Sequence, residues 1–181
     1  MSNHRDPLDL PHVTQTAWPR HAEGTYPILV CVQFDETGHN ALAMALRFAE
    51  RQPRALLQVV HVVADVDFSG RPSVIARHDR ELDEATAKLK EFVAARVGER
   101  AVEVKLHVRI GDVVENVLQM AMDYDVELIV VGTHGRSGVR RFALGSVAQK
   151  LVEAARCPML VATPRDFTGM ELSPRPDLPK P

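Results

Sequence analysis

Glycines and arginines gather in one segment of the chain, GTHGRSGVRRFALGS, which runs from Gly132 to Ser146. Glycines allow a backbone to approach an anion closely and to direct its amide groups toward it. Gly145 and Ser146 precede a predicted helix, and the N-terminus of a helix favours negative charge. Three arginines, of which Arg136 is the first, add positive charge to the same segment. The segment therefore predicts a phosphate-binding loop, with a glycine-rich turn carrying solvent-exposed arginines as the alternative.

The motifs of several other phosphate-binding and hydrolytic proteins are missing from the sequence. It contains no GxxxxGK[ST] segment, and its loop glycines are not spaced as GxGxxG. This disfavours a P-loop NTPase and a dinucleotide-dependent dehydrogenase. There is also no GxSxG elbow and no HExxH helix. His134 has no nucleophile beside it in sequence, so we expect it to be a ligand contact or a loop residue. We predict no catalytic residue and no metal ligands.

Composition and charge narrow the class of protein further. The 181 residues suit one domain with tails, and a net charge of −2 provides no basic field for nucleic acid. No apolar run approaches the roughly 18 residues that a membrane span needs. Residues 1–20 contain no apolar signal segment, so we expect a cytoplasmic protein. Cys31 and Cys157 offer neither a disulfide framework nor a metal-ligand spacing, so we expect both to be small core residues.

Two periodicities of apolar residues alternate through the middle of the chain. Short apolar runs predict strands, and stripes at helical spacing predict helices. Strands are expected at residues 28–34, 55–63, 102–110, 127–131 and 159–162, and helices at 37–51, 73–97, 112–124 and 146–155. This alternation predicts an α/β domain with a doubly wound, open parallel sheet and helices on both faces. Because prolines cluster outside it, we expect tails at 1–25 and 165–181 around a domain at 26–164.

The predicted elements place the loop at a particular edge of such a sheet. In an open doubly wound sheet, ligands bind beyond the carboxyl ends of the strands, where the strand order reverses. Two strand ends carry suitable residues: Gln33-Phe34-Asp35 follows the first strand, and Gly132 opens the loop after the fourth. We therefore expect the loop and the end of the first strand to belong to one ligand site.

The loop and its context resemble those of a known family. The spacing Gly132-x2-Gly135-x9-Gly145-Ser146 resembles that of the ATP-binding branch of the universal stress protein family. The segment ELIVVGTHG leads into the loop, and ALGSVAQKLVEAARCPMLV leads out of it, as in that family. The first two strands, in ILVCVQFDETGHNAL and LLQVVHVV, are also similar. The resemblance covers about residues 28–163, which is nearly the whole predicted domain.

The resemblance implies a fold, a ligand and an assembly. It implies a five-stranded parallel sheet of order 3-2-1-4-5, ATP as the ligand with or without Mg²⁺, and a homodimer formed through the strand at Met159–Ala162. An exposed apolar edge strand is a liability unless it is covered, which supports the last point. Carried over by position, the residues implied to contact the nucleotide are Gln33, Val62, Val131, Gly132, His134, Gly135, Gly145, Ser146 and Val147, beside the loop cation Arg136.

One residue departs from the pattern of the ATP-binding branch. Members of that branch usually carry Asp at the end of the first strand, where this chain has Gln33. An amide can donate and accept hydrogen bonds, but it supplies no carboxylate to a metal or a ribose. The main hypothesis is a regulatory stress-response protein whose dimer or partner contacts depend on bound ATP. The alternatives are a protein-interaction module that binds no nucleotide, which Gln33 motivates, and a slow ATPase.

Overall fold

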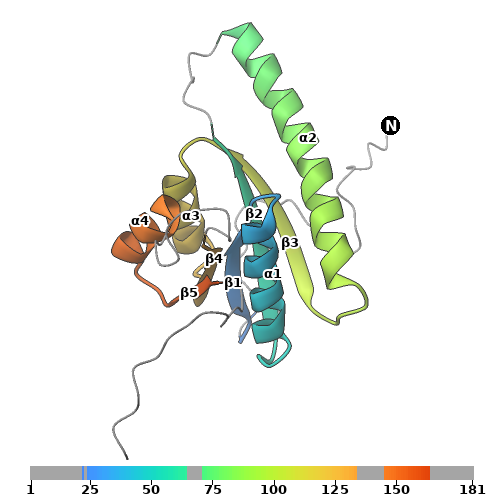
Figure 1. The fold of residues 1–181 in the computed structure, drawn as a ribbon, viewed down its shortest axis with the longest axis vertical. Coiled ribbons are helices and arrows are strands. Elements are labelled where there is room, and N and C mark those ends of the chain that lie inside the picture. Colours follow the sequence, from blue (N-terminus) through green and yellow to red (C-terminus); the bar gives the residue numbers. More distant parts are fainter. Residues whose placement is uncertain (1–21, 23, 65–70, 134–144, 164–181) are drawn as a thin grey trace, which may run out of the picture.

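The computed structural model describes residues 22, 24–64, 71–133 and 145–163, and within these ranges five strands alternate with four helices (Figure 1). Two strands have the predicted bounds, whereas the first one begins and ends earlier than predicted. The strands are β1 (Tyr26–Cys31), β2 (Ala55–Val63), β3 (Glu103–Ile110), β4 (Leu128–Gly132) and β5 (Met159–Ala162). The helices are α1 (Glu36–Ala49), α2 (Pro72–Val97), α3 (Val113–Asp123) and α4 (Ser146–Ala154).

All described strand pairs are parallel, and the sheet has the order β3-β2-β1-β4-β5. This confirms both the predicted fold class and the predicted strand order. Val30 in β1 lies in register with Val130 in β4, and both side chains are fully buried. Central strands that are covered on both faces need apolar side chains in both directions, which explains their unbroken apolar sequences.

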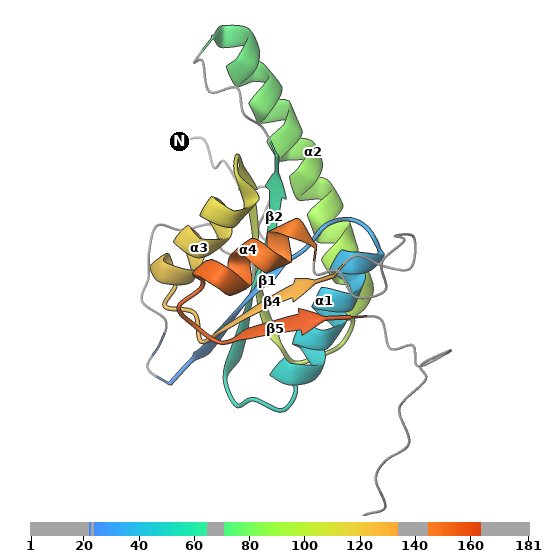
Figure 2. The same ribbon diagram turned by 60° about the vertical axis from the view of Figure 1, so that its left-hand side comes forward.

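Two apolar cores lie on opposite faces of the sheet. α1 and α2 cover one face, where Leu42 and Leu89 pack with Val30. α3 and α4 cover the other face, where Val117 and Leu151 pack with the inward residues of β1, β2 and β4. Figures 1 and 2 show these two helix pairs on either side of the sheet. The second core is called the α3/α4-side core below, because the candidate site continues from it.

Helices α1 and α3 each begin with a side-chain cap. The Asp35 carboxylate accepts a hydrogen bond from the Gly38 amide at 3.0 Å. The Asp112 carboxylate accepts one from the Glu115 amide at 2.9 Å. Such a cap satisfies one of the amides that have no partner within the helix, and it typically contributes about 1 kcal/mol to stability. Both caps lie where the chain leaves the carboxyl end of a strand.

The strands do not all end at the same level. Cys31, the last residue of β1, is in register with Val60, whereas the β2–β3 pairing continues to Val63 and Ile110. α2 also projects beyond the body of the domain, as Figures 1 and 2 show. β2, β3 and the projecting part of α2 therefore rise beside the shorter ends of the central strands. None of the described helices is both long enough and apolar enough to cross a membrane.

Candidate functional site

The ends of β1 and β4 form the point at which the strand order reverses. The two strands are neighbours in the sheet, but the chain leaves β1 for α1 on one face. It leaves β4 for α4 on the opposite face. Such a divergence opens a crevice at the carboxyl edge of the sheet, which is where open α/β sheets bind ligands. Both sequence segments expected to form the site, the end of β1 and the Gly132–Ser146 loop, begin at this point.

Two valines form an apolar surface at this edge. Val62 and Val131 are 8% and 3% exposed, and both belong to the α3/α4-side core. Val131 is in register with Cys31, and Val62 lies two residues beyond Val60, the β2 residue at the same level. Val62 therefore stands higher than Val131 on the same face of the sheet. The two side chains therefore form the apolar side of this edge, on the face that bears α3 and α4.

Gly132 brings the end of β4 against the start of α1. A Cβ atom at this position would overlap the carbonyl oxygen of Thr37 and lie 2.6 Å from its Cγ2 atom. The next residue is anchored on the other side, because the Thr133 amide donates to the Ala162 carbonyl at 3.0 Å. The loop therefore begins from a backbone fixed between α1 and β5, and Gly132 is needed for the close approach.

Helix α4 begins without a side-chain cap. Its N-cap residue is Gly145, which is buried, has backbone angles of φ −57° and ψ 150°, and makes no side-chain capping bond. Its carbonyl accepts the first intrahelical bond, from the Gln149 amide at 2.9 Å. The amides of the first turn have no acceptor within the helix, and the Ser146 side chain beside them is exposed. The side chain of Val147 packs against the α3/α4-side core, and the expected contact of its backbone with the nucleotide stays a prediction.

The predicted contact residues thus divide into three groups. Val62, Val131 and Gly132 lie at the carboxyl edge, with exposed Gln33 two residues beyond the end of β1. A second group belongs to the start of α4. The remaining three, near the start of the loop, lie outside the described residues: His134, Gly135 and Arg136.

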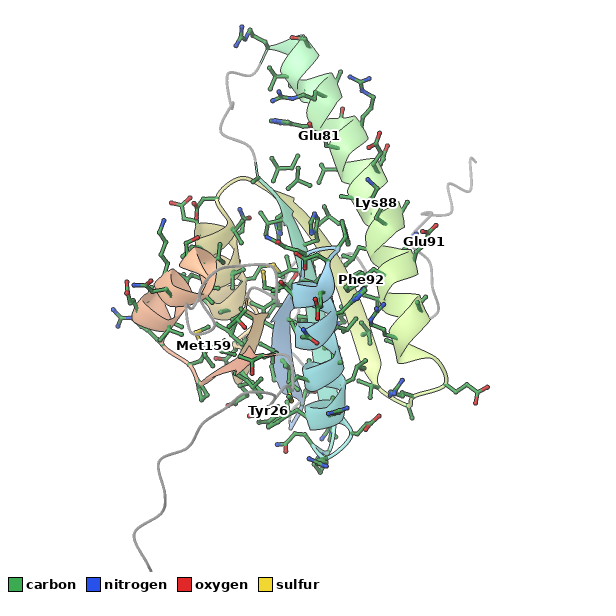
Figure 3. All side chains as sticks on the ribbon, in the orientation of Figure 1. Tyr26, Glu81, Lys88, Glu91, Phe92 and Met159 are labelled. Atoms are coloured by element: carbon green, nitrogen blue, oxygen red, sulfur yellow. The ribbon has the colours of Figure 1, made fainter. Side chains whose placement is uncertain are left out.

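An aromatic cluster beside Gln33 was not predicted from the sequence. The Phe34 ring stacks on the His61 imidazole with 4.1 Å between centroids, and its edge meets the Phe92 ring at 5.8 Å. His39 stacks on Phe92 at 4.7 Å, and the Arg96 guanidinium lies 4.9 Å from the same ring. Figure 3 shows Phe92 on the side of α2 toward α1 and Glu91 on the outer side. The cluster joins the β1 end to β2, α1 and α2.

Burial lowers the pKa values of the two histidines of this cluster and so favours their neutral form. His61 Nδ1 donates a hydrogen bond to the Val32 carbonyl at 3.0 Å, which leaves Nε2 without a proton in the neutral ring. Burial lowers the pKa of His61, and the Lys88 charge lowers it further. Burial and the Arg96 charge lower the pKa of His39. His61 belongs to β2, so its hydrogen bond to the Val32 carbonyl fixes the backbone just before Gln33 against β2.

The described residues fit a bound phosphate better than a bound cation. Within residues 22, 24–64, 71–133 and 145–163, no three His, Cys, Asp or Glu side chains are grouped to hold a metal ion. Asp35 and Asp112, at the ends of β1 and β3, each commit a carboxylate oxygen to a helix cap. Mg²⁺ is usually held by one or two carboxylates together with the phosphates of the substrate. A Mg²⁺ ion here would depend mainly on nucleotide oxygens.

Known proteins match both the sequence and the fold. A universal stress protein of Thermus aquaticus is 34% identical over 134 residues, which are 73% of this chain and 96% of that protein. A universal stress protein in complex with cAMP superposes with a TM-score of 0.59 at 19% identity, covering 77% of this chain and 98% of that one. An Arabidopsis thaliana member with AMP bound gives a TM-score of 0.53 at 17% identity, covering 76% and 91%.

The similarity of this chain to these two structures supports the fold, and the match of its sequence to a family profile establishes the family. The profile of the universal stress protein family matches residues 25–163, which include every described strand and helix. This chain therefore belongs to the universal stress protein family.

Proposed function

We propose that the protein binds an adenine nucleotide, ATP in the first place, at the crevice between the ends of β1 and β4. Its role is regulatory: occupancy of the site alters contacts between two copies of the chain or with a partner. The observation that carries the proposal is the uncapped start of α4 at Gly145, in a chain whose β4 end leads into a glycine- and arginine-rich loop. Helix amides without partners are suited to phosphate.

The apolar part of the crevice suits the base of the nucleotide. Val62 and Val131 make the edge apolar on one face, and the N-terminus of α4 belongs to the same side of the sheet. A nucleotide bound there would place its base on the valines and its phosphates toward Ser146. Apolar contact for the base together with a few backbone donors is the usual composition of such sites.

Two related structures support this choice of ligand. One universal stress protein of similar fold was solved in complex with cAMP, and another was solved with AMP bound. Both ligands combine adenine, ribose and phosphate, the parts that the described edge is suited to hold. ATP adds two phosphates, for which the first turn of α4 and the loop arginines supply donors and charge.

The same residues argue for binding with negligible turnover. Gln33 is exposed at the position where ATP-binding members usually carry Asp, and an amide neither activates a water nor neutralises a metal ion. Burial lowers the pKa of His61, but its Nδ1 atom is committed to a backbone carbonyl within the aromatic cluster. We therefore propose a nucleotide sensor rather than an ATPase.

We also propose that the chain forms a homodimer through β5. This strand is at one edge of the sheet and pairs with β4 alone among the described strands. Met159, Leu160 and Val161 are each partly exposed. Pairing with a second copy would satisfy the free backbone groups of this edge.

The direct test is to identify what the purified protein carries. We expect mass analysis of ligand released by denaturation to show an adenine nucleotide, and calorimetry with the stripped protein to show saturable binding of ATP. A stripped, folded protein that binds neither ATP nor AMP would contradict the proposal. It would favour the rival hypothesis of an interaction module without nucleotide, which Gln33 motivates. Rapid phosphate release from ATP would instead favour an enzyme.

A further inference from the structure

Arg109 lies beside the apolar wall of the proposed site. In the β2–β3 ladder it is the direct partner of Val62, and the next pair, Val63 and Ile110, ends both strands. Neighbouring strands are about 4.8 Å apart, and paired residues direct their side chains to the same face. Arg109 therefore extends the surface that Val62 begins, on the side away from β1.

The other odd-numbered residues of β3 confirm which face Arg109 occupies. The His107 ring lies 5.2 Å from the ring of Tyr124, which follows the last residue of α3. Burial lowers the pKa of His107 to about 4, and the charges of Arg109 and Lys105 contribute to that shift. These three side chains thus share the face that bears α3, where the buried apolar residues come from the other strands. β3 presents a polar and basic stripe here.

The Arg109 guanidinium has no protein anion or acceptor within the described ranges. Neither an ion pair nor a hydrogen bond joins it to another residue there, although the side chain is partly buried. The nearest carboxylate along the chain, Asp112, is occupied by the α3 cap. A partly buried cation of this kind gains most from a ligand group that lies against it.

We propose that Arg109 contacts the base of the bound nucleotide, with its guanidinium against the purine ring that rests on Val62. This inference rests on the proposed function. Arg109 is three strands away from β4 in the sheet, or about 14 Å at the usual strand spacing, so it lies at the base end of the site and not at the phosphates. Guanidinium is planar and weakly hydrated, and it stacks readily on aromatic faces. Arg109 thereby selects for an aromatic base.

The test separates recognition of the base from recognition of phosphate. Binding of ATP and of inorganic triphosphate is measured by calorimetry for the wild type, Arg109→Gln and Lys105→Gln. Lys105 is the matched control, since it has the same charge on the same face of β3 but pairs with Gln58, away from the edge. We expect Arg109→Gln to weaken ATP binding about tenfold and to leave triphosphate binding within twofold of the wild type. Lys105→Gln should leave both unchanged.

Three outcomes would overturn the inference. ATP binding unchanged in Arg109→Gln, or triphosphate binding weakened as much as ATP binding, would show that Arg109 does not contact the base. ATP bound no better than triphosphate by the wild type would show that no base pocket exists. If the wild type binds neither ligand, the proposed function itself fails, which distinguishes the two failures. Arg109→Ala, with its thermal unfolding compared with the wild type, serves as a second variant if Arg109→Gln does not fold.

Discussion

The Phe34 ring stacks on the His61 imidazole with 4.1 Å between their centroids and 28° between their planes. Phe34 follows Gln33, and His61 precedes Val62, so the stack joins the two chain segments that approach the candidate site from β1 and β2. The hydrogen bond from His61 to the Val32 carbonyl reinforces the same junction. The side chains that would contact a nucleotide are therefore held from behind, on the α1/α2 face of the sheet.

Gly132→Ala should destabilise the protein and weaken nucleotide binding. The added Cβ would overlap the Thr37 carbonyl oxygen, so either α1 or the end of β4 must move. We expect a loss of about 2 kcal/mol or more in the free energy of unfolding, measured with urea. Gly98→Ala is the contrasting variant: its φ of 55° disfavours alanine, a backbone strain that is not present at Gly132, and nothing lies within 4 Å of its Cβ. An unchanged free energy of unfolding in Gly132→Ala would mean that the Thr37 contact is unimportant.

Ser146→Pro should weaken ATP binding without destabilising α4. Proline is favoured at the first position of a helix, and the Gly145 angles of φ −57° and ψ 150° suit the residue before proline. The substitution removes one amide donor and the hydroxyl from the proposed phosphate contact. We expect about a tenfold rise in the dissociation constant with an unchanged melting temperature. Ser146→Ala, which removes the hydroxyl alone, should lose less; unaltered affinity in the proline variant would remove this amide from the site.

Gln33→Asp should change the metal dependence of ATP binding more than the affinity in EDTA. A carboxylate at this exposed position could bind Mg²⁺, but without a cation it repels the phosphates. The wild type should bind ATP with and without Mg²⁺ and release phosphate negligibly. Paired titrations of both proteins with and without Mg²⁺, together with a phosphate-release assay, test this. Identical Mg²⁺ dependence in the two proteins would place residue 33 outside the site.

Val161→Pro should convert the proposed dimer into monomers. The Pro158 and Ala162 carbonyls accept bonds from Ile129 in β4 and from Thr133 directly after it. Alternation along β5 therefore directs the Val161 amide to the free edge. Proline removes that amide without breaking a bond to β4. Val161→Ala keeps the amide and is the control for lost side-chain packing. Light scattering after size exclusion should give dimer mass for the wild type and the alanine variant; a dimeric proline variant would place the interface elsewhere.

His107 should make the stability of the protein depend on pH between about 6.5 and 4. Its pKa is lowered to about 4 in the folded chain, mainly by burial. The unfolded chain therefore binds a proton in this interval that the folded chain does not, and stability falls as the pH decreases. The loss attributable to His107 is at most about 3 kcal/mol. His107→Gln can still hydrogen-bond Gln58. In this variant the free energy of unfolding, measured with urea at pH 7, 5.5 and 4.5, should depend less on pH.

A steady difference between wild type and His107→Gln across these pH values would contradict the prediction. The hydrogen bond from His107 Nε2 to Gln58 Oε1, at 2.6 Å, is present in the neutral form that the folded chain favours. Protonation of the ring does not remove this bond, so the pH dependence arises from the cost of burying the charge beside Lys105 and Arg109.

The sheet and its helices could be predicted from the sequence because their signals are local. Apolar runs of strand length alternate with stripes at helical spacing, and only a parallel sheet covered on both faces accommodates that order. The end of β1 was misplaced by the same method: the apolar pattern continues through Val32 to Phe34, whereas β1 ends at Cys31. Apolar character persists there because Phe34 packs on His61 and Phe92 instead of extending a strand.

The aromatic cluster and the position of Arg109 could not be predicted from the sequence, for a different reason. Phe34, His61 and Phe92 come from three separate segments, and their spacing along the chain does not indicate that their rings are in contact. Arg109 resembles any polar residue of an edge strand until the β2–β3 register places it opposite Val62. The approach of the loop glycines to a phosphate stays a prediction, whereas the close approach of Gly132 to Thr37 of α1 was not predicted from the sequence.

The uncapped start of α4 links ligand occupancy to local order. α4 has nine residues, and helices this short depend on tertiary contacts and on their ends for stability. α1 and α3 hold their own first turns with aspartates, whereas the first turn of α4 would receive its acceptors from a phosphate. Amide hydrogen exchange in the first turn of α4 should therefore slow when nucleotide binds. The exchange rate of this one helix would report whether the site is filled.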